Sequence, residues 1–153
     1  VAALKKALAN LSPVRVNAFK EAVSEETPLA GVVISMVDSM SARKKIFEAV
    51  KFNASVPLYI EARSGGLVAS VYALDPRDSD QVEAYEKTLY GDDDASPTPC
   101  ANPDGLPALW AIASVIAALL LKYRDSEAAR FVEVLINFMG YPNIVARTLK
   151  EMK

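Results

Sequence analysis

The side chains that most often do chemistry in proteins are scarce in this sequence. There is no histidine, and the single cysteine is Cys100. Without histidine the chain lacks the commonest general base, the commonest zinc ligand and the usual catalytic triads. Cys100 lies among prolines and acidic residues, whereas a catalytic thiolate needs an electropositive setting. We therefore expect no enzymatic activity, no catalytic residues, no cofactor and no metal site.

One acidic segment spells a motif with known chemistry. Tyr90-Gly91-Asp92-Asp93 matches the metal-binding motif of RNA-dependent RNA polymerases, in which carboxylates at a hairpin tip hold two divalent ions. Here a segment of helical period precedes it, Asp94-Ala95-Ser96-Pro97 follows it, and the chain is far too short for a polymerase. A solvated acidic loop is the favoured interpretation, and casual calcium binding is the alternative.

Basic residues gather in the second half of the chain. They are Lys122, Arg124, Arg130, Arg147 and Lys150. On a final helix Arg147 and Lys150 would share a face, because they are three residues apart. The net charge of −2 argues against binding through overall charge but allows a local basic strip. These residues could line a groove for phosphates, or they could be scattered solubilising charge. The earlier run Arg43-Lys44-Lys45 is either a solvated helix face or an anion contact.

The elements that must position these residues belong to one domain. A chain of 153 residues, 52% of them hydrophobic and 24% charged, can bury a sizeable core. We assign residues 1–153 to a single domain. Because the sequence does not begin with methionine, we expect a fragment of a longer protein.

Helical spacing of apolar residues dominates the sequence. The expected helices cover roughly residues 1–10, 14–24, 29–40, 42–52, 80–90, 106–121, 126–139 and 142–153. Leu106–Leu121 is the most hydrophobic segment, but it is shorter than the roughly 20 apolar residues that cross a bilayer. It is therefore predicted to be a buried central helix.

One part of the chain has a different pattern. Val56–Glu61 and Leu67–Leu74 are rich in β-branched and aromatic residues, and Arg63-Ser64-Gly65-Gly66 between them is a credible turn. The sequence thus predicts a mainly α fold, a helical bundle around a buried hydrophobic helix with one β-hairpin.

Several segments, taken in order, resemble a viral family. Leu29–Val56 is similar to a buried helix that runs into a second helix, and the hairpin Val56–Leu74 and the helix Asp80–Tyr90 follow in the same order. Ile116–Lys122 is similar to a hydrophobic helix that ends in an RNA-contacting lysine. The family is the N-terminal domain of nucleoproteins from non-segmented negative-strand RNA viruses, of the pneumovirus and paramyxovirus type. The chain departs from it in having Arg130 alone where pneumoviruses have two adjacent arginines.

The resemblance implies a function. Such proteins coat the genome, and phosphate and sugar contacts that ignore base sequence hold the single-stranded RNA. Lys122 would touch the RNA backbone, with Arg124, Arg130, Arg147 and Lys150 as further candidates. Neighbouring nucleoprotein subunits and the viral phosphoprotein would be partners, and the virion and the host cytoplasm the locations. No membrane partner is expected.

The alternative function is a helical protein–protein interaction module with a groove for a partner helix beside Leu106–Leu121. Placement of Lys122, Arg124 and Arg147 on one concave face would favour RNA binding. An uncharged apolar groove would favour the interaction module.

Overall fold

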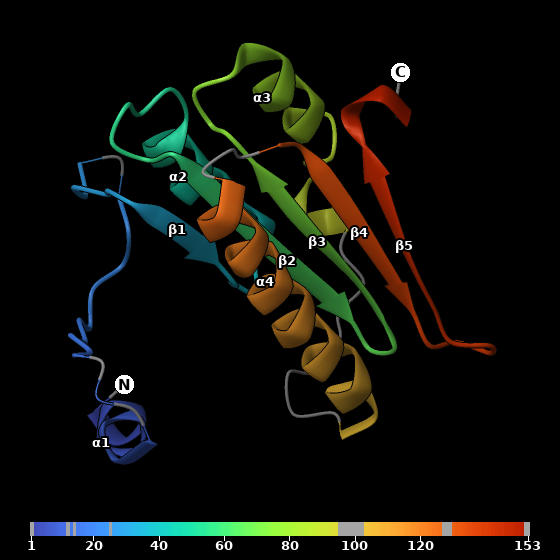
Figure 1. The fold of residues 1–153 in the computed structure, drawn as a ribbon, viewed down its shortest axis with the longest axis horizontal. Helices are drawn as coiled ribbons and strands as arrows, with labels where there is room; N and C mark the ends of the chain where they lie inside the picture. Colours follow the sequence, from blue (N-terminus) through green and yellow to red (C-terminus); the bar gives the residue numbers. More distant parts are fainter. Residues whose placement is uncertain are drawn as a thin grey trace.

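A five-stranded mixed sheet forms the centre of the molecule (Figure 1). This computed structural model describes residues 2–11, 13, 15–24, 26–94, 103–126 and 130–151. The strands are β1 (Val32–Ser35), β2 (Leu58–Gly65), β3 (Val68–Leu74), β4 (Val132–Asn137) and β5 (Asn143–Thr148), and they lie in that order across the sheet. β1 runs parallel to β2, and every later neighbour is antiparallel.

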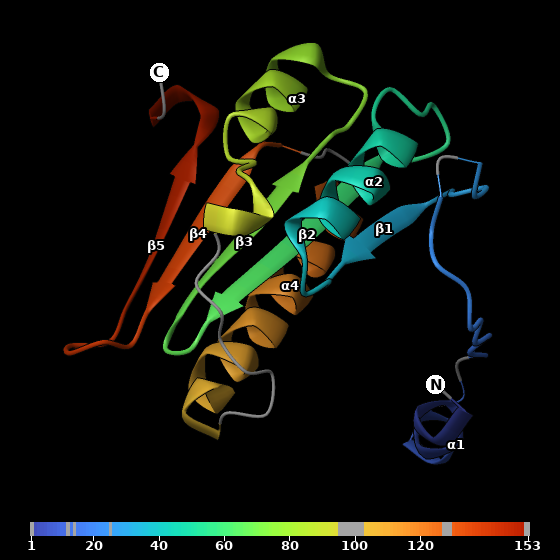
Figure 2. The ribbon, with the colours of Figure 1, turned by 180° about the vertical axis from the view of Figure 1, so that it is seen from behind.

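Helices cover both faces of the sheet. α2 (Met40–Val50) and α3 (Ser79–Glu86) lie on one face, and α4 (Leu106–Ser126) lies on the other (Figures 1 and 2). α1 (Ala2–Leu11) stands apart from the sheet. Short 3-10 turns complete the described structure: η1 (Asp92–Asp94), η2 (Pro103–Gly105) and η3 (Leu149–Glu151).

The alternation of side chains along the strands produces two cores. Tyr59, Tyr72 and Leu74 face α2 and α3, whereas the intervening Ile60 and Ala73 face α4. Since successive strand residues point to opposite faces, strands covered on both sides must be apolar at nearly every position. That requirement explains why β3 is hydrophobic at every position except Ser70, and why β2 begins with Leu58, Tyr59 and Ile60.

The predicted mainly α fold is wrong, because the protein is mixed α/β. Three expected helices contain strands instead: β1 lies within 29–40, β4 within 126–139 and β5 within 142–153. The helix expected over 14–24 is absent from the described residues 15–24, which have no regular secondary structure. The three strand segments are rich in valine and isoleucine, which favour a pleated surface when neighbouring strands are available to pair with.

Other predicted elements are confirmed. The hairpin is present as β2 and β3, and its turn lies at Gly66, whose φ of 66° suits glycine. Helices were also expected where α2, α3 and α4 occur. Ser39 caps the start of α2, and Asp78 caps the start of α3.

α4 is helical as predicted, but the prediction of a buried central helix is wrong, because α4 lies on the outside of the sheet and only one side of it is buried. Ala108, Ile112 and Ile116 pack on the sheet, whereas Trp110 and Leu121 on its outer side are exposed. α4 forms the outer layer on this face of the sheet, so only one apolar stripe of the helix packs against the strands. Among the described residues α4 alone is long and apolar enough to cross a membrane, judged by length and composition, and 17% of its apolar stretch is buried.

Candidate functional site

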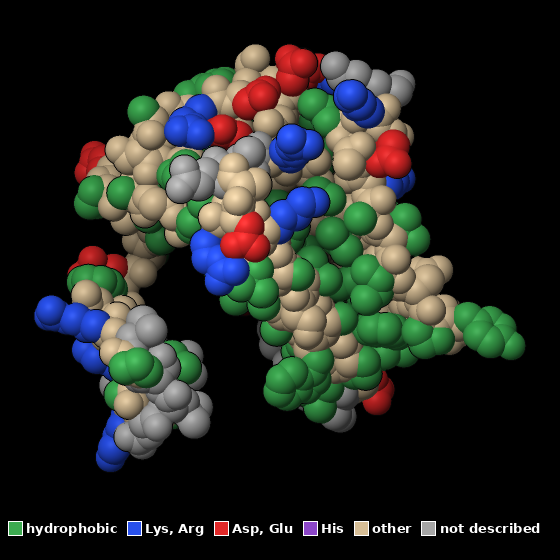
Figure 3. Space-filling view, viewed as in Figure 1, with side chains coloured by type: hydrophobic (Ala, Val, Ile, Leu, Met, Phe, Trp, Pro, Cys, Tyr) green, Lys and Arg blue, Asp and Glu red, His purple; other side chains and the backbone are tan. Residues whose placement is uncertain are grey.

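The five basic residues predicted from the sequence gather at one end of the sheet. They are Lys122 and Arg124 near the end of α4, Arg130 just before β4, Arg147 on β5 and Lys150 in η3. Strand pairing brings the last three together, because the pairing of β3 with β4 ends at Ala73 and Val132, and Val132 pairs with Thr148 at the end of β5. The end of α4 lies near them, because its Tyr123 packs against the same core cluster as Val132. Figure 3 shows Lys and Arg side chains around the end of α4. We call these five residues the basic end.

The residues of the basic end differ in how far their charge is already neutralised. Arg124 Nε lies 2.8 Å from the Asp125 carboxylate, and Arg147 Nη2 lies 2.6 Å from that of Glu133. Lys122, Arg130 and Lys150 are exposed and have no acidic partner within 4 Å among the described residues. These three cations are therefore available to an anionic ligand.

One expectation about these residues is wrong. Arg147 and Lys150 do not share a helix face, because one lies on β5 and the other in a 3-10 turn. The concave placement that would favour RNA binding is also not found, because Arg147 and Lys122 lie on different sides of the sheet. Glu133, the partner of Arg147, accepts a hydrogen bond from Tyr72, on the α2 and α3 side of the sheet, whereas Lys122 belongs to α4 on the opposite side.

Arg77 also joins this end, and no pattern in the sequence indicated it. Arg77 follows β3 and lies close enough to Tyr123 of α4 for the two to interact electrostatically. Its guanidinium holds the Asp75 carboxylate through two nitrogens, each 2.8 Å from an oxygen. The hydrogen bonds from Arg77 lower the pKa of Asp75. Arg77 thus adds positive charge to this region that Asp75 largely offsets.

A groove of about 1630 Å³ reaches from the β2–β3 turn at Gly66 to Glu133, the partner of Arg147. Its walls include apolar residues of α4, such as Leu109 and Ile116, and charged or polar residues such as Arg43, Arg63 and Glu133. It is not the uncharged apolar groove that would favour a partner-helix module. Its charged wall belongs to a buried polar cluster that has a clear structural role.

At the centre of this cluster, two arginines share one buried carboxylate. Glu61 on β2 is fully buried; Arg43 Nε donates to one of its oxygens, and Arg63 Nε donates to the other at 2.7 Å. Tyr85 Oη also donates to Glu61 at 3.3 Å. A buried carboxylate needs such partners, because burial of an unpaired charge is costly.

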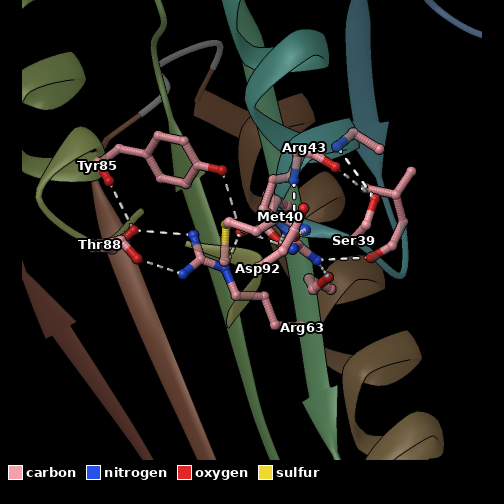
Figure 4. Close-up of polar contacts among 12 residues, drawn as sticks. Ser39, Met40, Arg43, Arg63, Tyr85, Thr88 and Asp92 are labelled. Carbon is pink, nitrogen blue, oxygen red and sulfur yellow. Dashed lines mark hydrogen bonds and ion pairs between the residues drawn. The ribbon is translucent and has the colours of Figure 1, made fainter. Parts of the chain in front are cut away.

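The two guanidinium groups tie separate elements together (Figure 4). Arg43 Nη2 donates to the carbonyl of Val37 at 2.8 Å, and Arg63 donates to the backbone oxygen and hydroxyl of Thr88 at 2.7 and 3.0 Å. The Arg63 guanidinium also lies 4.6 Å from the ring centre of Tyr72. Burial lowers the pKa of Arg63, but the Glu61 carboxylate and the nearby tyrosines outweigh it, so the pKa is raised overall.

The tyrosines of this cluster cannot act as bases near neutral pH. Burial raises the pKa of Tyr59 and of Tyr72 to about 12, and it raises the pKa of Tyr85 as well. The phenols therefore stay protonated, and their rings pack at centroid distances such as 5.7 Å between Tyr59 and Tyr85. The cluster stabilises the layer that α2 and α3 form on the sheet.

The acidic segment has a structural role too. Asp92 Oδ1 accepts hydrogen bonds from the backbone N–H groups of Met40 at 2.6 Å and Ser41 at 3.1 Å, at the start of α2. The described residues contain no group of three or more His, Cys, Asp or Glu side chains placed to hold a metal ion. The described residues therefore support neither the polymerase motif nor calcium binding. Cys100 lies outside the described residues.

The spacing of charges in β2 indicates the buried cluster. Glu61 and Arg63 are the two charged residues of a β-rich segment, and residues two apart in a strand point to one face. That spacing indicates a paired set of charges. Arg43, which was assigned to a solvated face or an anion contact, is buried instead.

No protein-family model, curated protein or solved structure matches this chain. The buried helix that the nucleoprotein resemblance implied at the start of Leu29–Val56 is not present, because β1 lies there. The resemblance itself stays a prediction. What the chain binds is therefore inferred from the basic end.

Proposed function

We propose that the chain binds the sugar–phosphate backbone of single-stranded RNA at the basic end, without regard to base sequence. One observation carries the proposal. Basic residues far apart in sequence, from Lys122 to Lys150, gather at one end of a molecule whose net charge is −2. Neutralisation of several phosphates releases counterions, which favours binding whatever the bases are.

The chemistry of the basic end suits phosphates better than bases. Lysine is a flexible point charge and arginine a rigid fork, and both reach phosphate oxygens without reading base edges. Lys122 projects from a helix anchored by Ile112 and Ile116, so the start of its side chain is held firmly. In a longer protein of the resembling type, this binding would coat a viral genome, and we propose encapsidation as its activity.

The test is a titration of the purified chain with labelled single-stranded oligoribonucleotides of unrelated sequence at several salt concentrations. Lys122→Ala should weaken binding to each oligonucleotide by a similar factor. A plot of the logarithm of the binding constant against the logarithm of the salt concentration should also have a slope that is shallower by about 0.7 unit, because one phosphate is no longer neutralised. The matched control is Lys6→Ala, which removes an exposed lysine from α1, and it should leave both quantities unchanged.

An ordinary structural role for Lys122 predicts a different outcome. A cation near a helix C-terminus is favourable by itself. If Lys122 only stabilises the C-terminal end of α4, Lys122→Ala will lower the melting temperature slightly. The RNA affinity and its dependence on salt will not change. That result, or a wild-type chain that binds none of the oligonucleotides, overturns the proposal.

A further inference from the structure

β5 has a free edge. Its six residues pair with β4 along one side and end the sheet, and no described strand lies along its other side (Figure 1). Every residue of β5 is exposed. The outer backbone N–H and C=O groups of such a strand are open to pairing with another extended chain.

This edge lacks the features that usually protect one. Protected edges are short, bulged, or carry proline or several charges. β5 pairs with β4 at six consecutive positions without a bulge, and its sequence Asn143–Thr148 contains no proline. Its one charged residue, Arg147, lies against Glu133 of its own sheet. The opposite edge differs, because β1 has only four residues.

Apolar side chains extend the same surface. Ile144 and Val145 are 53% and 48% exposed, on opposite faces of the strand, and the turn before them leaves Tyr141 97% exposed. Figure 3 shows hydrophobic side chains along this side of the molecule, away from the basic end. Exposed apolar side chains beside a free strand edge favour an interaction site there.

We propose that β5 pairs antiparallel with β5 of a second copy, so that one sheet runs through both copies. A second copy fits this edge because the strand is complementary to itself. In a register centred on Val145, this valine faces its counterpart, Arg147 faces Asn143 of the other copy, and no like charges meet. The antiparallel direction also places the two basic ends far apart, whereas parallel pairing would bring them together. Such a two-fold interface uses the same patch on both copies.

The experiment measures the mass of the chain in solution across a concentration series, by sedimentation equilibrium. The wild-type chain should form dimers. Val145→Lys should weaken the dimer by about tenfold or more, because two like charges then meet across the shared edge. An equal mixture of Val145→Lys and Val145→Glu should restore dimers, since opposite charges then face each other.

The control is Val32→Lys on β1, where the valine is 39% exposed, and this variant should dimerise like the wild type. Circular dichroism checks that each variant keeps its fold, which is expected because both positions are exposed. A wild-type chain that stays monomeric at every concentration would overturn the proposal. So would equal weakening by Val32→Lys, or dimers unaffected by Val145→Lys.

Discussion

Glu61 shows how a single residue can hold three elements together. Its carboxylate accepts from Arg43 of α2, from Arg63 of its own strand and from Tyr85 of α3. Removal of one partner from a buried ion pair leaves uncompensated charge behind, whereas replacement of the whole set by apolar residues can be harmless. Two buried guanidinium groups depend on this one carboxylate.

Replacing Glu61 with Gln should therefore lower the free energy of unfolding by about 3 to 5 kcal/mol. Urea denaturation measures the loss. The control is Glu83→Gln, whose partner Lys87 is exposed at the C-cap of α3, and it should change stability by less than about 0.5 kcal/mol. Similar small losses for both variants would show that the buried cluster does not stabilise the fold.

Asp92 should make stability depend on pH. Hydrogen bonds from Ser41 and from the backbone at Met40 lower its pKa from 3.8 in the folded chain. A carboxyl group with a lowered folded pKa contributes stability above its unfolded pKa, and the contribution is lost as pH falls through the folded value. The wild-type chain should thus be more stable than Asp92→Asn near pH 6, and the difference should shrink below about pH 4. Denaturation of both proteins at a series of pH values tests this. If the difference in stability between the wild type and Asp92→Asn does not change with pH, the prediction for Asp92 is wrong.

The length and capping of a helix or strand determined whether it could be predicted from the sequence. α4 is long, and α2 and α3 begin at strong capping residues, so helical period identified them. β4 is short, and the apolar residues around it from Phe131 to Phe138 also fit a helix. Short apolar segments satisfy both periods, and only pairing with distant strands decides between them. The basic residues could therefore be named from the sequence. Where they lie together in the fold could not, because that depends on the register of β3, β4 and β5.

α4 offers a test of its one-sided packing. Ile112 is 4% exposed against the sheet, whereas Trp110 is 73% exposed on the outer side. Ile112→Ala should lower the free energy of unfolding by about 2 to 5 kcal/mol, since it leaves a cavity in the core. Trp110→Ala should cost less than about 0.5 kcal/mol despite the larger side chain removed. Denaturation of the two variants side by side measures both, and a larger loss at Trp110 would contradict the exposure of the outer side of α4.

Basic and apolar surface residues lie at opposite ends of the whole molecule. The basic end lies where β4 begins and β5 finishes, and the turn with Tyr141 lies at the other end of the same strands. The two proposals share Arg147, which belongs to the basic end and also lies on β5, but the tested residues Lys122 and Val145 each belong to one surface only. Loss of one activity through substitution of either tested residue should leave the other activity intact, so the two tests are independent.

α1 stands outside this arrangement. Its described side chains are exposed, and the earliest residue that packs against either core is Val23. A chain without residues 1–17 should therefore melt within about 2 °C of the full chain and keep the same urea m-value, because little surface is lost from the folded core.

A longer deletion is the matched comparison. Removal of residues 1–30 takes away Val23 and Leu29, which pack on the core, and also the hydrogen bond from Asn53 Nδ2 to the carbonyl of Leu29 at 3.2 Å. This deletion should lower the melting temperature clearly, whereas the shorter one should not. If the 1–17 deletion already lowers the melting temperature by several degrees, α1 packs against the body in solution and does not stand apart from it as it does in Figure 1.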